Sequence, residues 1–232
     1  VDPAQLTDVR LLKRHVLKRC IYGVDLNPMA VELAKVSLWL DCFTFGAPLS
    51  FLDHHLRCGN SLIGAMAQDV AEAMAGPQDA GQLTFLTGPF VGLLRAAEMM
   101  RGISRITDVT LDQVRESGAL FKAFDRAARP YKQLLDIHVS RHFGVERAEE
   151  FLTLYGADAL RADPDELGRP YRAVIEDARD LYEEKRFFHW DLEFPEVFID
   201  LERAEWEENG GFDAVIGNPP YGALFNRSDK DY

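Results

Sequence analysis

The sequence predicts an α/β fold with a parallel sheet, interrupted by a long helical insertion. Two short apolar segments have the pattern of buried strands, at residues 20–25 and 212–217, and helical patterns flank the first of them. A helix, a strand and a helix in succession favour a parallel sheet. Between the two strands lies a long stretch rich in Ala, Leu, Arg and Glu, which is typical of amphipathic helices. We therefore expect residues 1–64 and 187–232 to form the α/β core and residues 65–186 to form the helical insertion.

Helix-start signals open the chain. Asp2 is available as an N-cap and Pro3 suits the first helical position, so we expect a helix that runs to about Arg19. The first strand follows, and Asn27 and Pro28 repeat the cap-and-proline pattern directly after it. We expect a second helix to begin there.

A second segment of strand and turn character lies at residues 56–64, just before the insertion. Glycine and proline punctuate the insertion, and we expect them to divide it into several helices. These residues are Gly76–Pro77, Gly88–Pro89, Gly102, Gly118, Pro130, Gly144, Gly156 and Pro164. The α/β pattern resumes after Gly210–Gly211, where the last predicted strand runs directly into Asn218.

The composition excludes several classes of protein. No stretch approaches the roughly 18 consecutive apolar residues of a membrane span, and the N-terminus lacks a signal-peptide pattern, so we expect a cytoplasmic protein with no membrane partner. The three cysteines contain no Cys-x-x-Cys pair, which suits a reducing compartment. A net charge of -12 would repel nucleic acid, so contacts with DNA are expected to be local or to be made by segments outside this chain.

The most distinctive chemistry follows the last predicted strand, at Asn218, Pro219, Pro220 and Tyr221. An α/β sheet binds ligands just beyond the carboxyl ends of its strands. Two prolines fix the backbone and remove two N–H donors, so carbonyl oxygens are free to accept. The Asn218 side chain and the Pro219 carbonyl would then suit the two hydrogens of an adenine amino group. Tyr221 offers a flat face for a base outside the duplex stack, a contact worth about 1–3 kcal/mol.

A simpler interpretation of this tetrapeptide stays open. Asn-Pro commonly starts a turn, and Tyr221 would then only cover the sheet edge. The apolar strand before the motif, with Asp213 near its start, favours the functional interpretation.

A second candidate site lies at the end of the first predicted strand. An acid placed like Asp25 binds ribose hydroxyls in folds that hold dinucleotides or S-adenosylmethionine. Alternatively, Asp25 or Asn27 only caps the following helix, and both roles are compatible if Asn27 caps and Asp25 binds. The string Cys58–Gly64 contains Gly-Asn-Ser, which turn chemistry alone explains.

Two further groups of residues are expected to be structural. His54, His55 and Cys58 match no familiar metal site, and paired loop histidines are expected to face solvent, so no metal is predicted. The aromatic and acidic string at residues 188–198 is expected to form a covered edge or a buried corner.

Five strings in this order and separation resemble one family. They are Ile21–Pro28, Ala30–Lys35, Cys58–Gly64, Phe188–Phe198 and Asn218–Tyr221. The family is the adenine-specific DNA methyltransferase class of large single-chain type II restriction-modification enzymes and related phage-defence methyltransferases. The resemblance covers residues 21–221, with the insertion between the third and fourth strings.

The resemblance implies a Rossmann-like methyltransferase sheet and transfer of a methyl group from S-adenosylmethionine to the amino group of a flipped adenine in double-stranded DNA. Asp25, with Leu26 beside it, would bind the cofactor ribose. Asn60 and Ser61 would lie at the motif that contacts the cofactor adenine, where related enzymes often have Asp. The residues that would hold the target adenine are Asn218, Pro219, Pro220 and Tyr221.

The chain departs from the family at one motif. The family has a glycine-rich strand-to-helix turn before the Asp25 strand, whereas this chain has no glycine before Gly23. Without glycine, the close approach of backbone to cofactor is lost. We therefore expect the chain to be part of a larger protein that also carries a target-recognition domain, and to bind cofactor poorly alone.

Three alternative functions remain. A protein glutamine methyltransferase also resembles this chain in its Asn-Pro-Pro-Tyr motif, but its compact catalytic domain lacks so large an insertion. A non-catalytic scaffold, in which the acidic insertion docks a partner protein, suits the net charge. A nicotinamide dehydrogenase would need the same glycine-rich turn and leaves the Asn218 motif unexplained.

Overall fold

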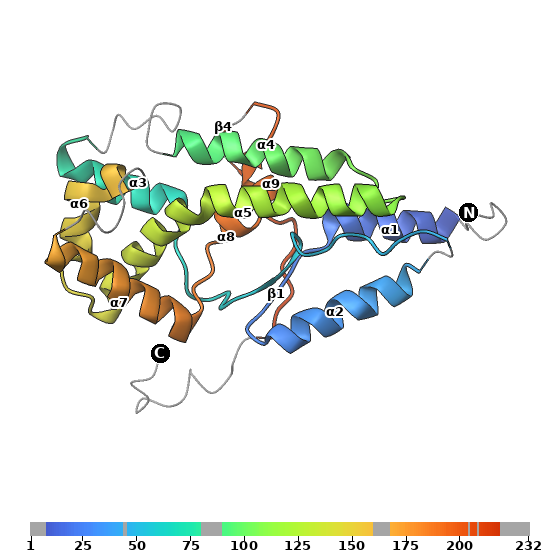
Figure 1. Cartoon of the computed structure of the whole chain (residues 1–232), viewed down its shortest axis with the longest axis horizontal. Helices are drawn as coiled ribbons and strands as arrows, with labels where there is room; N and C mark the ends of the chain where they lie inside the picture. The colour runs from blue at the N-terminus through green and yellow to red at the C-terminus, as the bar shows by residue number, and fades with distance from the viewer. Residues whose placement is uncertain are drawn as a thin grey trace.

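The computed structural model describes residues 8–43, 46–79, 90–159, 168–203, 205–207 and 209–218. These residues are mostly helical, and Figure 1 shows two long helices, α4 and α5, lying side by side across the molecule. None of the described helices is both long and apolar enough to cross a membrane.

The α/β part of the described chain is small. Its elements are α1 (Asp8–Cys20), β1 (Gly23–Asp25), α2 (Pro28–Asp41) and β2 (Leu56–Cys58). The two strands are parallel, and Asp25 lies opposite Cys58. Asn27 caps α2 as predicted, because its Oδ1 accepts a hydrogen bond from the Met29 N–H at 2.9 Å.

The helical segment follows. Its described elements are α3 (Ala67–Asp79), α4 (Val91–Arg105), α5 (Leu111–Ser140), the 3-10 turn η2 (Arg141–Phe143), α6 (Ala148–Ala159) and α7 (Arg169–Lys185). The chain then forms α8 (Trp190–Glu193), α9 (Pro195–Phe198) and the antiparallel pair β3 (Ile199–Asp200) and β4 (Glu205–Trp206).

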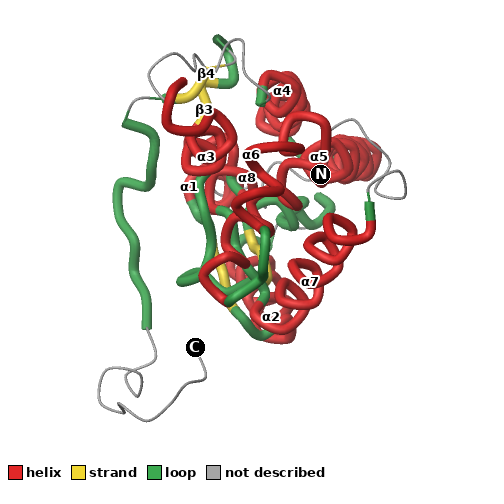
Figure 2. The backbone as a smooth tube through the Cα atoms, turned by 90° about the vertical axis from the view of Figure 1, so that its left-hand side faces the viewer, coloured by secondary structure: helices red, strands yellow, loops and turns green. Residues whose placement is uncertain are grey.

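The predicted sheet is present only in part. β1 has three residues instead of six and is partly exposed rather than buried. The prediction of a buried strand at residues 212–217 is wrong, because these residues form a loop in which Val215 is 75% and Ile216 98% exposed. An apolar segment becomes a buried strand only where neighbouring strands pair with it, and among the described residues none pairs with this segment. Figure 2 shows this loop running along one side of the molecule, apart from the helices.

Several predicted helix breaks are also wrong. α5 continues through Gly118 and Pro130, and α3, α4 and α6 each continue through a predicted glycine. An internal proline removes one hydrogen bond and bends a helix, and α5 changes direction along its length in Figure 1. Gly144 does end a helical turn, with a left-handed φ of 87°.

The main hydrophobic core lies within the helical segment. Its largest fully buried side chains are Phe90, Leu93, Met100, Ile103, Phe124, Leu134, Leu135, Ile137 and Phe151. A smaller cluster holds α1 and α2 against β2, and consists of Leu17, Val31, Cys42, Leu52 and Leu56. Each large apolar side chain contributes about 1.5–3 kcal/mol when buried, so the helical segment provides most of the hydrophobic stabilisation.

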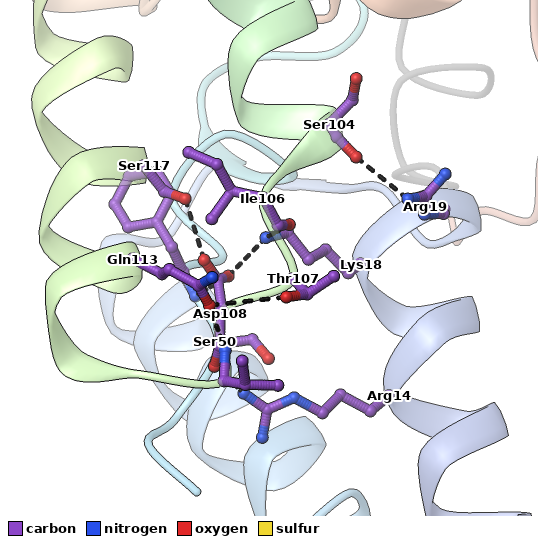
Figure 3. Close-up of polar contacts among 12 residues, drawn as sticks. Arg14, Lys18, Arg19, Ser50, Ser104, Ile106, Thr107, Asp108, Gln113 and Ser117 are labelled. Atoms are coloured by element: carbon purple, nitrogen blue, oxygen red, sulfur yellow. Dashed lines mark hydrogen bonds and ion pairs between the residues drawn. The ribbon is translucent and has the colours of Figure 1, made fainter.

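A buried ion pair joins the helical segment to α1 (Figure 3). Asp108, in the turn between α4 and α5, is fully buried, and its Oδ2 lies 2.7 Å from Lys18 Nζ. The same carboxylate accepts hydrogen bonds from Ser117 Oγ at 2.9 Å and from the Phe51 N–H at 3.1 Å. Burial lowers the pKa of Lys18, although the contact with Asp108 opposes that shift. This carboxylate therefore ties the α4–α5 turn both to α1 and to the chain before β2.

Candidate functional site

The carboxyl ends of β1 and β2 bring two predicted cofactor residues to one edge. Asp25 ends β1, and Asn60 follows β2 by two residues. The Gly59 N–H donates to the Asp25 carbonyl oxygen at 3.1 Å, so the two loops leave the strands side by side. Ligands of parallel sheets bind at such an edge.

Asp25 keeps one carboxylate oxygen free within the described part of the chain. Its side chain is exposed, and its Oδ1 accepts from the Asn27 N–H at 2.7 Å. Asn27 supplies the cap of α2, so Asp25 Oδ2 remains available to a hydroxyl donor. Leu26 is 53% exposed beside it and offers apolar surface.

Asn60 and Ser61 form a turn that distant residues hold in place. Asn60 Oδ1 accepts from the Leu62 N–H at 3.1 Å, which is the local turn chemistry that the sequence suggests. The Asn60 N–H donates to the Arg186 carbonyl at 2.7 Å, and the Ser61 carbonyl accepts from Trp190 Nε1 at 3.1 Å. No described residue accepts from the Asn60 side-chain NH2 group, which stays a free donor.

Two glycines let a distant segment approach this turn. A Cβ at Gly59 would lie 2.6 Å from Phe188 Cδ2, and a Cβ at Gly64 would lie 1.9 Å from the Phe188 carbonyl oxygen. The Phe188 N–H donates to the Ile63 carbonyl at 2.8 Å. The glycines of the Cys58–Gly64 string are therefore needed for close packing as well as for turning the chain.

The aromatic and acidic string forms a buried corner, as predicted. Its most buried members are each at most 2% exposed: Phe188, His189, Asp191, Leu192 and Phe194. His189 Nδ1 accepts from the Ala65 N–H at 3.2 Å, so its Nε2–H donates to Asp136 Oδ1 at 3.0 Å. Asp191 accepts from the Ala67 N–H at 2.7 Å at the start of α3, and burial raises the pKa of this carboxyl to about 6.

An ion-pair cluster fixes β2 to α5. Arg57 Nε donates to Glu193 Oε2 at 2.7 Å, and Lys132 Nζ lies 2.8 Å from Glu193 Oε1. Burial alone would raise the pKa of Glu193, but the two cations lower it to about 2. The Arg57 guanidinium also lies 4.9 Å from the centre of the Phe121 ring.

The expectation that His54 and His55 face solvent is wrong. They are 3% and 2% exposed, and their rings lie 4.1 Å apart. The Tyr22 ring covers His55 at 4.0 Å, and the Phe51 ring stacks on His54 at 5.4 Å. Burial lowers the pKa of His54 well below its usual value, so this ring is neutral and packs as part of the interior.

Among the described residues, no hydrogen bond or ion pair links Asn218 to the Asp25 edge. Asn218 lies in the exposed loop, and Pro219, Pro220 and Tyr221 lie outside the described residues. The loop is anchored at Phe212, whose ring centre lies 5.3 Å from that of Tyr22, just before β1.

Arg186 also supports this site, although the sequence does not predict it. This residue ends α7 with a φ of 55°, its carbonyl holds Asn60, and its Nη1 donates to Cys58 Sγ at 3.4 Å. No local pattern marks it, because its partners lie about 126 residues earlier in the chain.

The chain is similar to known restriction-modification proteins. Residues 19–232 match the family model described as Eco57I restriction-modification methylase. A putative type II restriction enzyme and methyltransferase of Methanocaldococcus jannaschii is 25% identical over 249 aligned residues, which cover 97% of this chain. They cover 20% of that relative, so the chain spans about a fifth of its length. No solved structure matches. The predicted resemblance to restriction-modification methyltransferases is confirmed, and the chain belongs to the Eco57I restriction-modification methylase family.

Proposed function

We propose that the chain is part of a DNA methyltransferase that transfers a methyl group from S-adenosylmethionine to the amino group of adenine. Membership of the family supports methyl transfer to DNA. The observation that carries the cofactor assignment is the parallel β1–β2 pair, which places Asp25 and Asn60 on adjacent loops. The adenine target rests on the Asn218 motif of the sequence.

The residues at this edge fit an adenosine group. Asp25 retains a carboxylate oxygen for a ribose hydroxyl, and Asn60 retains an amide N–H for a ring nitrogen. Leu26 provides exposed apolar surface for a flat base, with Ser61 in the facing turn. S-adenosylmethionine, when bound, supplies an electrophilic methyl group.

The residues after Gly217 are proposed to prepare the target amine. Asn218 Oδ1 and the Pro219 carbonyl accept its two hydrogens, which draws the nitrogen lone pair out of conjugation with the ring and makes the nitrogen a nucleophile. Pro220 keeps the turn rigid. Tyr221 stacks on the base after it leaves the duplex.

Duplex DNA is the proposed partner, gripped mainly by other parts of the parent protein. This chain carries 38 acidic and 26 basic residues and would repel DNA as a whole. We propose that a target-recognition domain of the parent protein supplies the positive surface.

A cofactor-binding assay distinguishes the proposed methyltransferase from a non-catalytic module. Labelled S-adenosylmethionine is titrated into the full-length parent protein and its variants. Asp25→Asn should weaken binding by about tenfold or more, because a charge-assisted hydrogen bond is lost. Asp112→Asn is the matched control, since this α5 side chain is 91% exposed and lies away from the edge. Equal affinities for the wild type and Asp25→Asn would reject the cofactor role.

A methylation assay tests whether adenine is the target base. After reaction with tritiated S-adenosylmethionine and mixed-sequence DNA, the label should be recovered in N6-methyladenine. Asn218→Ala should abolish labelling and leave cofactor affinity nearly unchanged, and Tyr221→Ala should reduce labelling less than Tyr221→Asp. Full labelling by Asn218→Ala would contradict the mechanism, and label on cytosine or on protein would contradict the adenine assignment.

A further inference from the structure

A cavity of about 480 Å³ lies where the helical segment meets the Asn60 turn. Residues 62–65 form one side, and Asp69 and Glu72 of α3 form another. Residues 138 and 139 at the end of α5 and residues 141–143 of η2 complete it. This volume is in the range of small-molecule sites. The cavity lining includes neither Asp25 nor Asn60, so it is distinct from the proposed cofactor edge.

Two histidines hold an arginine in the wall of this cavity. Arg141 Nε donates to His142 Nε2 at 3.2 Å, and Arg141 Nη2 lies 3.1 Å from His138 Nε2. A guanidinium has only donors, so both rings accept from it through Nε2. Burial lowers the pKa of His138 to about 4, and the charge of Arg141 adds to the shift. Arg141 is therefore oriented by two rings that accept from it, and it lines the cavity.

Most of the Arg141 donors are unused within the described chain. A guanidinium has five N–H groups, and the two histidines take two of them. His138 is 6% exposed, and no described group accepts from its Nδ1–H. A buried donor left unpaired, like His138 Nδ1 in the wall of this cavity, favours a ligand there.

The opposite side of the cavity supplies acceptors. Asp69 Oδ2 accepts from the Met66 N–H at 2.9 Å, and Glu72 Oε1 accepts from Gln68 Nε2 at 3.2 Å. In each carboxylate the second oxygen has no partner among the residues that the structure describes. Leu62, on the loop after the Asn60 turn, adds apolar surface.

The charges of the lining define the ligand class. Two carboxylates and one guanidinium disfavour a free phosphate or another simple anion, and the guanidinium disfavours a cation. No group of three or more His, Cys, Asp or Glu in the described chain is arranged to hold a metal. A neutral, flat ligand fits if it has acceptors for Arg141 and donors for the carboxylates. Guanine has this pattern, with O6 and N7 as acceptors and N1–H and the 2-amino group as donors.

We propose that this cavity binds a guanine base, with Arg141 donating to O6 and N7 and with Asp69 and Glu72 accepting from N1–H and the 2-amino group. The base belongs either to a free nucleoside or to an unpaired position of a nucleic acid strand. A sugar and any phosphate then extend out of the cavity, away from the carboxylates.

Calorimetric titration of the full-length parent protein with guanosine tests the proposal, with an expected Kd on the order of 100 µM. 7-Deazaguanosine lacks the N7 acceptor and inosine lacks the 2-amino donor, so each should bind about tenfold more weakly. Arg141→Lys should weaken guanosine binding by a similar factor. This variant should bind 7-deazaguanosine about as tightly as it binds guanosine. The Glu72→Gln variant should bind inosine about as tightly as it binds guanosine.

The controls separate this site from the others. Arg115→Lys, an exposed arginine of α5, should bind guanosine like the wild type. Asp25→Asn should also bind it normally, so failure of the cofactor proposal and failure of this one are distinguishable. Tighter binding of a short single strand with one guanine than of guanosine would assign the ligand to nucleic acid, and the reverse would assign it to a free nucleoside.

Four results would overturn the proposal. The first is equal affinity for guanosine, inosine and 7-deazaguanosine, and the second is adenosine binding as tightly as guanosine. The third is an absence of guanosine binding at 10 times the expected Kd, and the fourth is displacement of guanosine by inorganic phosphate alone.

Discussion

Gly64 limits how closely two distant parts of the chain can pack. A methyl group there would meet the Phe188 carbonyl oxygen at 1.9 Å, and a backbone atom cannot rotate away. Gly64→Ala should therefore lower the free energy of unfolding by about 2 kcal/mol or more. Gly118→Ala is the matched control, because its Cβ would lie at an ordinary 3.5 Å from the Phe51 ring and helix α5 would gain about 0.5–1 kcal/mol. Urea denaturation measures both, and equal effects would contradict the close approach.

Asp191 should make stability depend on pH. Its pKa is raised from 3.8 to about 6 by burial, so the folded protein binds a proton more readily than the unfolded chain. The contribution of Asp191 to stability is therefore largest below about pH 4 and falls as pH rises to about 6, by up to about 3 kcal/mol. Subtracting the curve of Asp191→Asn from that of the wild type isolates this slope. Asp112→Asn, at an exposed position, should leave the wild-type curve unchanged, and a flat difference for Asp191→Asn would contradict the raised pKa.

The roles of some of these residues could be predicted from the sequence. Asn27 was identified as a cap because its partner, the Met29 N–H, is two residues away. The hydrogen-bond partner of Asp191 was not predictable, since Ala67 is 124 residues away. The same holds for Glu193, whose pair with Arg57 spans 136 residues and turns a charged residue into an interior one.

At the scale of elements, the Lys18–Asp108 pair should determine how firmly α1 holds the α4–α5 turn. Asp108→Ala leaves Lys18 buried without its partner, so we expect a loss of about 3–5 kcal/mol and faster hydrogen exchange in α1. Asp41→Ala removes the exposed pair with Lys13 and should change stability by at most about 1 kcal/mol. A loss for Asp108→Ala as small as that for Asp41→Ala would show that the turn is held by apolar packing instead.

Helix existence was easier to predict than helix ends. The composition of residues 65–186 correctly indicated helices, because that signal is summed over many residues. The predicted breaks at Gly118 and Pro130 failed because Phe121, Phe124 and Ala128 of the same helix are buried in the main core. Tertiary packing outweighs a local penalty of about 1 kcal/mol for glycine and about 3 kcal/mol for proline.

At the scale of the whole molecule, the α/β part leaves much apolar surface uncovered. Met29, Leu33, Val36 and Leu40 follow one another at helical spacing along α2 and are 46–72% exposed. We expect Leu33→Gln with Leu40→Gln to change the free energy of unfolding by less than about 0.5 kcal/mol and to reduce concentration-dependent association of the chain in ultracentrifugation. Leu52→Gln, at a position 1% exposed, should instead destabilise the chain by several kcal/mol. Unchanged association of the doubly substituted variant would show that these exposed apolar residues of α2 do not mediate self-association.

The sheet was predicted less well than the helices. The apolar residues at 212–217 have the composition of a buried strand, but a strand also needs partners across its edges. The hydrogen-bond partners of a strand depend on the assembled fold and cannot be predicted from the sequence of the strand alone. The same limit applies to the Asn218 motif, whose distance from Asp25 depends on where that segment lies.

The hydrogen bond between Ile63 and Phe188 has a consequence for how this protein can change over time. The chain leaves the α/β core at Ile63 and returns to it at Phe188, and these two points touch. A long insertion whose two ends lie next to each other can be lengthened, shortened or replaced without moving those ends apart. The Asn60 turn would then keep its shape while the helices beyond it diverge, so the helical segment is the part of the chain best suited to be exchanged between relatives as a module.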